Sequence, residues 1–174
     1  NGSIHQVKLV IIDYIQSNHA LVFPVKELCT LCSSYNIPTL VDAAHALGSM
    51  PLNIIDIAPT FLVSNAHKWL CSGKGVSLLY VSPQWHAQIK PSVVSHGYSS
   101  QTLAGKFTWV GLQDYAHYLS RITALDAYKM IGERSIYSYI SSMIQKIGTF
   151  LTTQWNSELL GPTDMFSSMI AIRL

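Results

Sequence analysis

The fold is decided by a stretch of ten residues, Phe61-Leu62-Val63-Ser64-Asn65-Ala66-His67-Lys68-Trp69-Leu70. Its first part is short and apolar, which predicts a buried strand over residues 61–64. The strand leads directly into a polar corner that holds a histidine and a lysine. In open α/β sheets, ligands bind just beyond the carboxyl ends of the strands. Lys68 is therefore the first candidate for a functional residue.

Further short apolar runs flank this stretch and predict strands at residues 7–12, 37–41 and 76–81. Apolar residues at helical spacing predict helices at 25–35, 115–131 and 136–151, a short turn or helix at 52–59, and a last strand at 168–174. Strands that alternate with helical or looped crossovers indicate an α/β fold with a largely parallel sheet. Residues 82–111 are expected to be irregular, and loops of this length are often functional.

The chain is expected to be a piece of a longer protein. It begins at Asn1 without a methionine and ends at Leu174 inside a strand-like run. Charged residues make up only 11%, and the mean hydropathy is +0.26, which suits surfaces that missing segments or a second subunit cover. A break at residues 132–134 predicts that residues 1–131 belong to a large domain and residues 132–174 begin a truncated second domain.

Charge and cysteine content exclude several classes of function. The net charge is +2 without a basic stripe, which argues against nucleic acid, and no apolar run is long enough to cross a membrane. Three cysteines without a paired framework favour a reducing, cytoplasmic compartment. Cys29 and Cys32 fall within a helical pattern, so small packed residues are the favoured interpretation over a redox or metal site.

The ends of the predicted strands carry a group of reactive side chains. Asp42 ends the 37–41 strand, the loop at residues 13–18 follows the first strand, and Lys68 follows the third. Because parallel strands end at one edge of the sheet, we expect these side chains to lie together. His45 and His67 belong to the same edge.

The residue types at this edge suit an aldehyde cofactor. A lysine amine forms a Schiff base with an aldehyde, and a carboxylate such as Asp42 keeps a pyridine nitrogen protonated. His45 can stack on or hydrogen-bond the ring, and His67 can bind a phosphate together with free backbone N–H groups. Each residue also has an ordinary structural interpretation: a surface lysine, a loop cap, or a histidine bonded to backbone. A zinc site built from Asp42, His45, His67 and Cys71 is a second alternative, which no HxxxH or paired CxxC spacing supports.

Five segments match a known pattern: Val41-Asp42-Ala43-Ala44-His45-Ala46-Leu47-Gly48, Val63 to Leu70, Asp13 to Asn18, Phe23 to Leu28, and Phe107 to Tyr115. In these segments the chain resembles the class V aminotransferase family of fold-type I pyridoxal-phosphate enzymes. Within that family it is similar to the isopenicillin N epimerase-like and hercynylcysteine sulfoxide lyase-like proteins. The resemblance covers nearly the whole chain. It implies an aspartate aminotransferase-type large domain, followed by the start of a small α+β domain.

The resemblance also implies a role for each candidate residue. Lys68 would form the internal aldimine with pyridoxal 5′-phosphate and move protons during turnover. Asp42 would pair with the pyridinium nitrogen, and His45 would contact the phenolic oxygen of the ring. His67 would bind the phosphate, and Asn18 would lie near the cofactor or substrate.

The family also implies a homodimer with shared active sites and a small amino-acid substrate. Gly111 would reach the phosphate of the partner subunit's cofactor. Relatives usually carry Gly-Thr-Arg-Asp where this chain has Gly111-Leu112-Gln113-Asp114. Leu112 lacks the hydroxyl that would contact the phosphate, and Gln113 lacks the charge of the arginine, so cofactor affinity or substrate choice is expected to differ.

The expected reaction is labilisation of a bond at the α-carbon of an amino acid, with C–S cleavage or epimerisation as the outcome. The residues present are expected to be inactive without the flanking segments. The alternative is a catalytically impaired relative that keeps the scaffold as a dimerisation or regulatory module.

Overall fold

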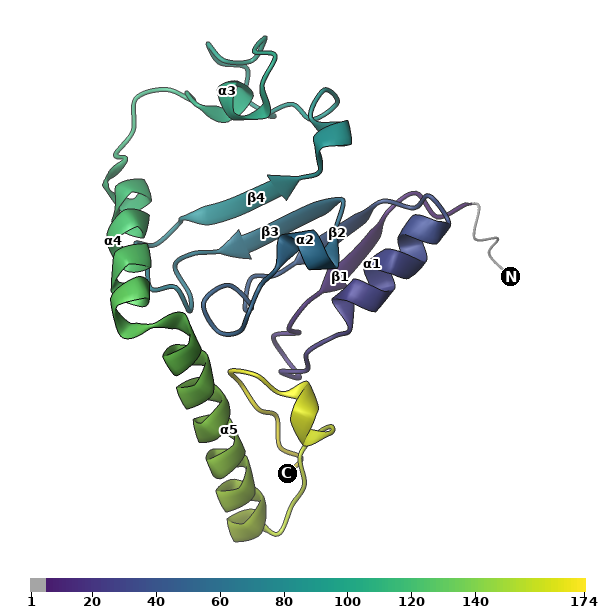
Figure 1. The fold of residues 1–174 in the computed structure, drawn as a ribbon, viewed down its shortest axis with the longest axis vertical. Coiled ribbons are helices and arrows are strands. Elements are labelled where there is room, and N and C mark those ends of the chain that lie inside the picture. Colours follow the sequence, from purple (N-terminus) through teal and green to yellow (C-terminus); the bar gives the residue numbers. More distant parts are fainter. Residues whose placement is uncertain (1–5) are drawn as a thin grey trace.

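Four strands form one sheet in the order β1-β2-β3-β4 in the computed structural model, which describes residues 6–174 (Figure 1). The strands are β1 (Val10–Asp13), β2 (Thr39–Asp42), β3 (Phe61–Asn65) and β4 (Ser77–Val81). β1 pairs in parallel with β2, and β2 pairs in parallel with β3. The predicted α/β fold with a largely parallel sheet is confirmed, and the first four predicted strands are shifted by a few residues at most.

β4 runs antiparallel to β3. Residues 66–76 join the two strands without forming a helix, and they contain Gly75 at a φ of +85°. A parallel connection needs a crossover of a dozen or more residues, usually a helix, which a loop of this kind cannot provide. The sheet is therefore mixed at this edge.

The helices alternate with the strands and then dominate the second half of the chain. They are α1 (Val25–Ser34), α2 (Ile54–Ile57), α3 (Leu103–Phe107), α4 (Ala116–Ile131) and α5 (Glu133–Trp155), with 3₁₀ turns η2 (Pro83–Trp85) and η3 (Thr163–Met165). α1 buries Val25 and Cys29, which are one turn apart on the same face, and it packs on β1, β2 and α2. The predicted helices at 25–35, 115–131 and 136–151 are confirmed, and α5 extends beyond its predicted range at both ends.

The core lies where β2 and β3 meet the helices. Val41 and Leu62 have no exposed surface, and they pack with Ile12, Val25 and Ile57. Full burial of each such side chain contributes roughly 1.5–3 kcal/mol. A second, smaller cluster forms beyond the end of β3, where α4 covers three buried residues: Ala66, Leu70 and Val76. α4 thus packs directly on the segment that contains Lys68.

The predicted strand at residues 168–174 is wrong. Within it, only Ile172 forms a bridge, to Leu159, and two backbone hydrogen bonds flank that bridge. The partner segment is short because Asn156, in a left-handed conformation, ends α5 just before it and Gly161-Pro162 breaks it just after. A longer ladder has no room to form on that segment.

The C-terminal residues fold back onto the first half of the chain. Val22 N donates to the Met165 carbonyl at 2.8 Å, and Leu21 forms a bridge with Phe166. The division into domains at residues 131 and 132 stays a prediction.

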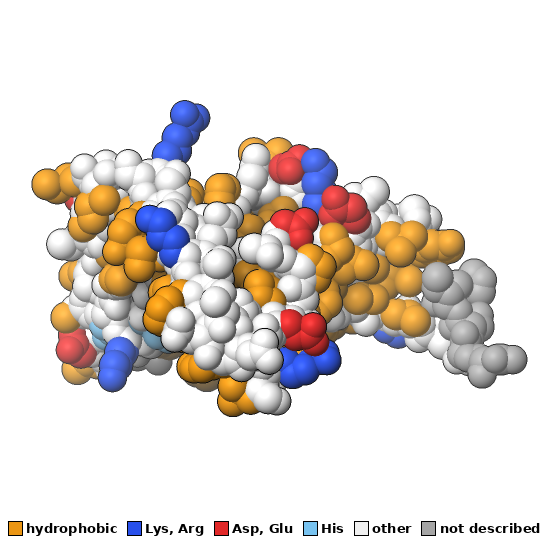
Figure 2. All heavy atoms as spheres, turned by 90° about the horizontal axis from the view of Figure 1, so that it is seen from below, with side chains coloured by type: hydrophobic (Ala, Val, Ile, Leu, Met, Phe, Trp, Pro, Cys, Tyr) orange, Lys and Arg blue, Asp and Glu red, His pale blue; other side chains and the backbone are white. Residues whose placement is uncertain are grey.

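The face shown in Figure 2 carries scattered charges with apolar side chains between them. Large apolar side chains with more than half of their surface exposed include Ile11 at 66%, Leu119 at 61% and Met130 at 87%. None of the helices within residues 6–174 has the length and hydropathy that a membrane span requires. The cytoplasmic compartment stays a prediction.

Two isoleucines of α2 provide a matched test of the core. Ile57 is 4% exposed and belongs to the core cluster, whereas Ile55 is 92% exposed. We expect Ile57→Ala to lower the free energy of unfolding by about 2–4 kcal/mol because it leaves a cavity. Ile55→Ala should change it by less than about 0.5 kcal/mol. Denaturant unfolding of both variants measures the difference, and equal effects would contradict this packing.

Candidate active site

The candidate site lies at the edge of the sheet where the three parallel strands end. Asp13 and Asp42 are paired in register as the last residues of β1 and β2. The loop after β3 approaches the same edge and carries Lys68. Parallel pairing therefore brings together groups that are far apart in the sequence, as the strand pattern predicts.

Lys68, His45 and Asp42 line one small cleft. The Lys68 Nζ atom lies 3.1 Å from the His45 Nε2 atom, within hydrogen-bonding distance. The cleft has a volume of about 130 Å³, and its lining is completed by Asp13, Ile15, Ser17 and Ala44. The structure thus brings together an amine, an imidazole and a carboxylate, three of the six predicted site residues.

Backbone contacts fix the Asp42 carboxylate. Its Oδ1 atom accepts a hydrogen bond from the Ala44 N–H at 2.9 Å, which leaves its other oxygen free for a ligand. The next residue, Ala43, is buried and bonded on both sides: its N–H donates to the Val63 carbonyl at 2.8 Å, and its carbonyl accepts from the Ser64 hydroxyl at 2.7 Å. The loop that follows β2 is therefore anchored to β3 before it turns towards His45.

His45 is held in its neutral form. Burial lowers the pKa of its imidazole below the ordinary value of 6.5, and the nearby Lys68 ammonium lowers it further, while the Asp42 and Asp13 carboxylates oppose the shift. In neutral His45 the Nε2 atom accepts from the lysine, so the ring proton lies on Nδ1. Nδ1 is buried and has no hydrogen-bond partner among the described residues.

The remaining predicted residues do not line this cleft. His67 places its Nδ1 atom 3.1 Å from the Val76 carbonyl, in the turn next to Lys68. Asn18 is exposed in the turn after β1. Gly111 lies in the connection before α4 at a φ of +115°, and its carbonyl accepts from the Tyr115 hydroxyl at 3.0 Å. Their roles stay predictions.

Two polar lining residues do not belong to the predicted set. Asp13, the last residue of β1, and Ser17, in the loop that follows it, both line the cleft. The sequence pattern does place that loop at this edge. Asp13 also had a recognisable signal, since it directly follows the predicted strand at 7–12, as Asp42 follows the strand at 37–41.

The cleft fits the ring end of pyridoxal phosphate. A half-buried lysine amine and a carboxylate with one free oxygen face the same space, which are the two groups that an aldehyde and a pyridinium N–H require. Lys68 and Asp42 would hold the cofactor, and the orphaned Nδ1 atom of His45 marks a buried donor still without an acceptor.

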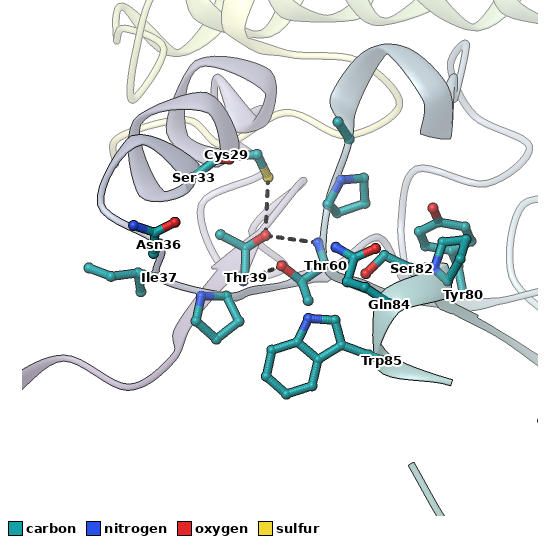
Figure 3. Close-up of a pocket in the computed structure, with 14 residues that line it drawn as sticks. Cys29, Ser33, Asn36, Ile37, Thr39, Thr60, Tyr80, Ser82, Gln84 and Trp85 are labelled. Carbon is teal, nitrogen blue, oxygen red and sulfur yellow. Dashed lines mark hydrogen bonds between the residues drawn. The ribbon is translucent and has the colours of Figure 1, made fainter. Parts of the chain in front are cut away.

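A wider cleft of about 430 Å³ lies at the opposite edge of the sheet (Figure 3). Its lining has no charged side chain, and its threonines are bonded to each other: the N–H groups of Thr39 and Thr60 each donate to the other's hydroxyl, at 3.0 and 3.2 Å. Cys29 also points at Thr39, with its Sγ atom 3.6 Å from the threonine hydroxyl, as packed residues do. Neither a lysine nor a carboxylate is available there for the expected chemistry.

No group of three or more His, Cys, Asp or Glu side chains within residues 6–174 is arranged to hold a metal ion. The candidate zinc ligand Cys71 is exposed, and its Sγ atom lies 3.6 Å from the Trp69 carbonyl.

The known proteins that this chain resembles in sequence include a lyase, desulfhydrases and an epimerase. The hercynylcysteine sulfoxide lyase of Schizosaccharomyces pombe is 31% identical over 87% of this chain and 41% of its own length. The putative L-cysteine desulfhydrase 1 of Oryza sativa subsp. japonica is 30% identical over 97% of this chain and 36% of its own length. The isopenicillin N epimerase of Streptomyces clavuligerus is 24% identical over 97% of this chain and 47% of its own length. The chain therefore spans less than half the length of these curated relatives.

The fold is also similar to that of a known enzyme. The apo structure of a cysteine desulfurase from Thermococcus onnurineus NA1 superimposes with a TM-score of 0.84 at 17% identity, over 96% of this chain and 44% of that one. The family model described as aminotransferase class-V matches residues 3–158. This family depends on pyridoxal 5′-phosphate, and the chain belongs to it.

Proposed function

We propose that this chain forms the cofactor-binding part of an enzyme that cleaves a C–S bond of an amino acid. The substrate is a small amino acid with sulfur attached to its side chain. The observation that carries the proposal is the 3.1 Å contact between Lys68 and His45 in a cleft that Asp42 also lines. A lysine without a functional role would have no reason to lie beside both His45 and Asp42.

Lys68 is the residue that attaches the cofactor and moves the proton. Its amine is a nucleophile once it gives up a proton, and the His45 Nε2 atom is the acceptor within reach. The same amine then removes the α-proton of the substrate, as a base held in place by its loop. Bound pyridoxal phosphate supplies an aldehyde for attachment and a ring that takes up the electron pair.

Asp42 orients and polarises the ring. Its free oxygen accepts the pyridinium N–H, because the Ala44 N–H already occupies the other oxygen. His67 binds the phosphate through its Nε2 atom, which stays available when Nδ1 bonds to the Val76 carbonyl. Asn18 approaches the cofactor or substrate from its exposed turn.

The names of the relatives support the lyase branch. A sulfoxide lyase and a cysteine desulfhydrase both act on carbon–sulfur bonds, whereas an epimerase returns the α-proton from the opposite face. The two branches share the first proton removal. They differ in whether a sulfur group leaves.

The alternative, an impaired relative that serves as a dimerisation or regulatory module, rests on Leu112 and Gln113. Leu112 is 94% exposed and can offer a phosphate only its backbone N–H. Against this alternative, an amine, an imidazole and a carboxylate still line one cleft at the sheet edge.

The reaction is tested with the full-length protein loaded with pyridoxal phosphate. We expect release of sulfur from L-cysteine or from hercynylcysteine sulfoxide. Asp42→Asn should lower kcat by about 10²–10³-fold, the loss that follows removal of one preorganised electrostatic contact. Asp56→Asn is the matched control, because Asp56 lies on the surface and, among residues 6–174, forms an ion pair with Lys26 alone, at 2.6 Å.

Exchange of the α-proton with deuterated water without sulfur release would instead select the epimerase branch. Cofactor binding with neither exchange nor release would support the regulatory module.

The dimer is proposed to share its two active sites. In this arrangement each site uses Lys68 of one subunit and the Gly111 region of the other, where Gly111 needs a positive φ that other residues rarely adopt. We expect Lys68→Ala and Gly111→Val homodimers to be inactive. Heterodimers of the two variants should regain one working site, with both wild-type residues, and about half of the wild-type activity per dimer.

Activity of purified heterodimers measures this complementation. If both residues served the same subunit's site, every site in the heterodimer would contain one substitution. Heterodimers as inactive as the parents would then contradict the shared site.

A further inference from the structure

The loop with His45 and the loop with Lys68 touch at a glycine. Gly48 has a φ of +87°, and a Cβ atom placed on it would lie 2.6 Å from the Leu70 N atom and 2.7 Å from the Trp69 carbonyl carbon. Real Cβ contacts are not this short, so only glycine lets the two backbones approach this closely. The contact lies three residues after His45 and directly after Lys68.

A tyrosine from α4 holds this glycine. The Tyr128 hydroxyl donates a hydrogen bond to the Gly48 carbonyl, across 80 residues of sequence. The Tyr128 ring packs on the small cluster that contains Leu70, so one side chain contacts both loops. Burial raises the pKa of Tyr128 to about 12, so its hydroxyl remains a donor throughout the neutral range.

Two further hydrogen bonds hold the His45 loop and the Lys68 loop in place. The buried Ser49 hydroxyl donates to the His45 carbonyl at 2.5 Å, next to the glycine that Tyr128 holds. Eight residues before Tyr128 on α4, the Ser120 hydroxyl accepts from the Gly73 N–H at 2.8 Å, at the end of the lysine loop. α4 stands at the end of the sheet towards which β3 points (Figure 1), so it supports both loops from one side.

We propose that Tyr128 is a positioning residue, whose hydrogen bond to Gly48 holds the His45 loop against the Lys68 loop and so sets the contact between the two side chains. Tyr128 does not line the cleft that holds the reactive groups. It acts through Gly48, and the inference rests on the proposed function because that contact is the one assigned to proton transfer.

The test measures His45 directly in the full-length, cofactor-free protein. With ¹³C-labelled histidine, an NMR titration gives the pKa of His45, which is sensitive to burial and to the facing charges of Lys68, Asp42 and Asp13. We expect Tyr128→Phe to raise this pKa, since a loosened loop lets water in and separates His45 from the lysine. Lys68→Met, which removes the charge that lowers the pKa, serves as the reference for a lost contact.

Tyr137→Phe is the matched control. The Tyr137 ring lies 6.5 Å from that of Tyr128 and is also half-buried, but no hydrogen bond joins its hydroxyl to Gly48 in the described chain. Its removal should leave the pKa of His45 unchanged. In the loaded enzyme, Tyr128→Phe should lower kcat more than it raises KM.

An unchanged pKa of His45 in Tyr128→Phe, or the same shift in both variants, would overturn the proposal. Loss of the folded circular dichroism signal in Tyr128→Phe alone would also overturn it, because the hydroxyl would then support the whole fold. The titration needs no cofactor, so a protein that never binds pyridoxal phosphate fails the proposed function and still reports on Tyr128.

Discussion

The contact between Lys68 and His45 depends on the parallel pairing of β2 with β3. Because of this pairing, both strands end at the same edge of the sheet. The Ser64 hydroxyl, near the end of β3, donates a hydrogen bond to the carbonyl of Ala43, the first residue after β2. A reversal of either strand would move its loop to the opposite edge. The amine, the imidazole and the carboxylate would then have no common cleft.

Neutral His45 follows from the same packing. The loop that carries it lies against the lysine loop at Gly48, where no side chain separates the two backbones. Burial and the lysine charge then favour the uncharged imidazole, whose Nε2 atom accepts a hydrogen bond from Lys68. The chemistry proposed for Lys68 thus depends on a backbone approach that a single Cβ would prevent.

Much of this site could be predicted because it follows from strand order. Asp42 is recognisable because it directly follows an apolar run, and Lys68 because it lies in the polar corner after another such run. The sheet rule places the two together. The sequence does not show that the Val76 carbonyl occupies one nitrogen of His67, or that Tyr128 reaches Gly48, since both depend on how distant segments pack. The strand expected at 168–174 failed for a related reason, because a β-strand needs a partner of equal length.

Borohydride reduction of the full-length protein loaded with pyridoxal phosphate measures whether Lys68 attaches the cofactor. Reduction makes the bond between the lysine and the cofactor permanent. Peptide mass spectrometry then identifies which lysine carries the cofactor. We expect one modified lysine, Lys68, and no label at the exposed Lys74 a few residues later. A label on another lysine, or no label in a protein that binds the cofactor, would contradict the role of Lys68.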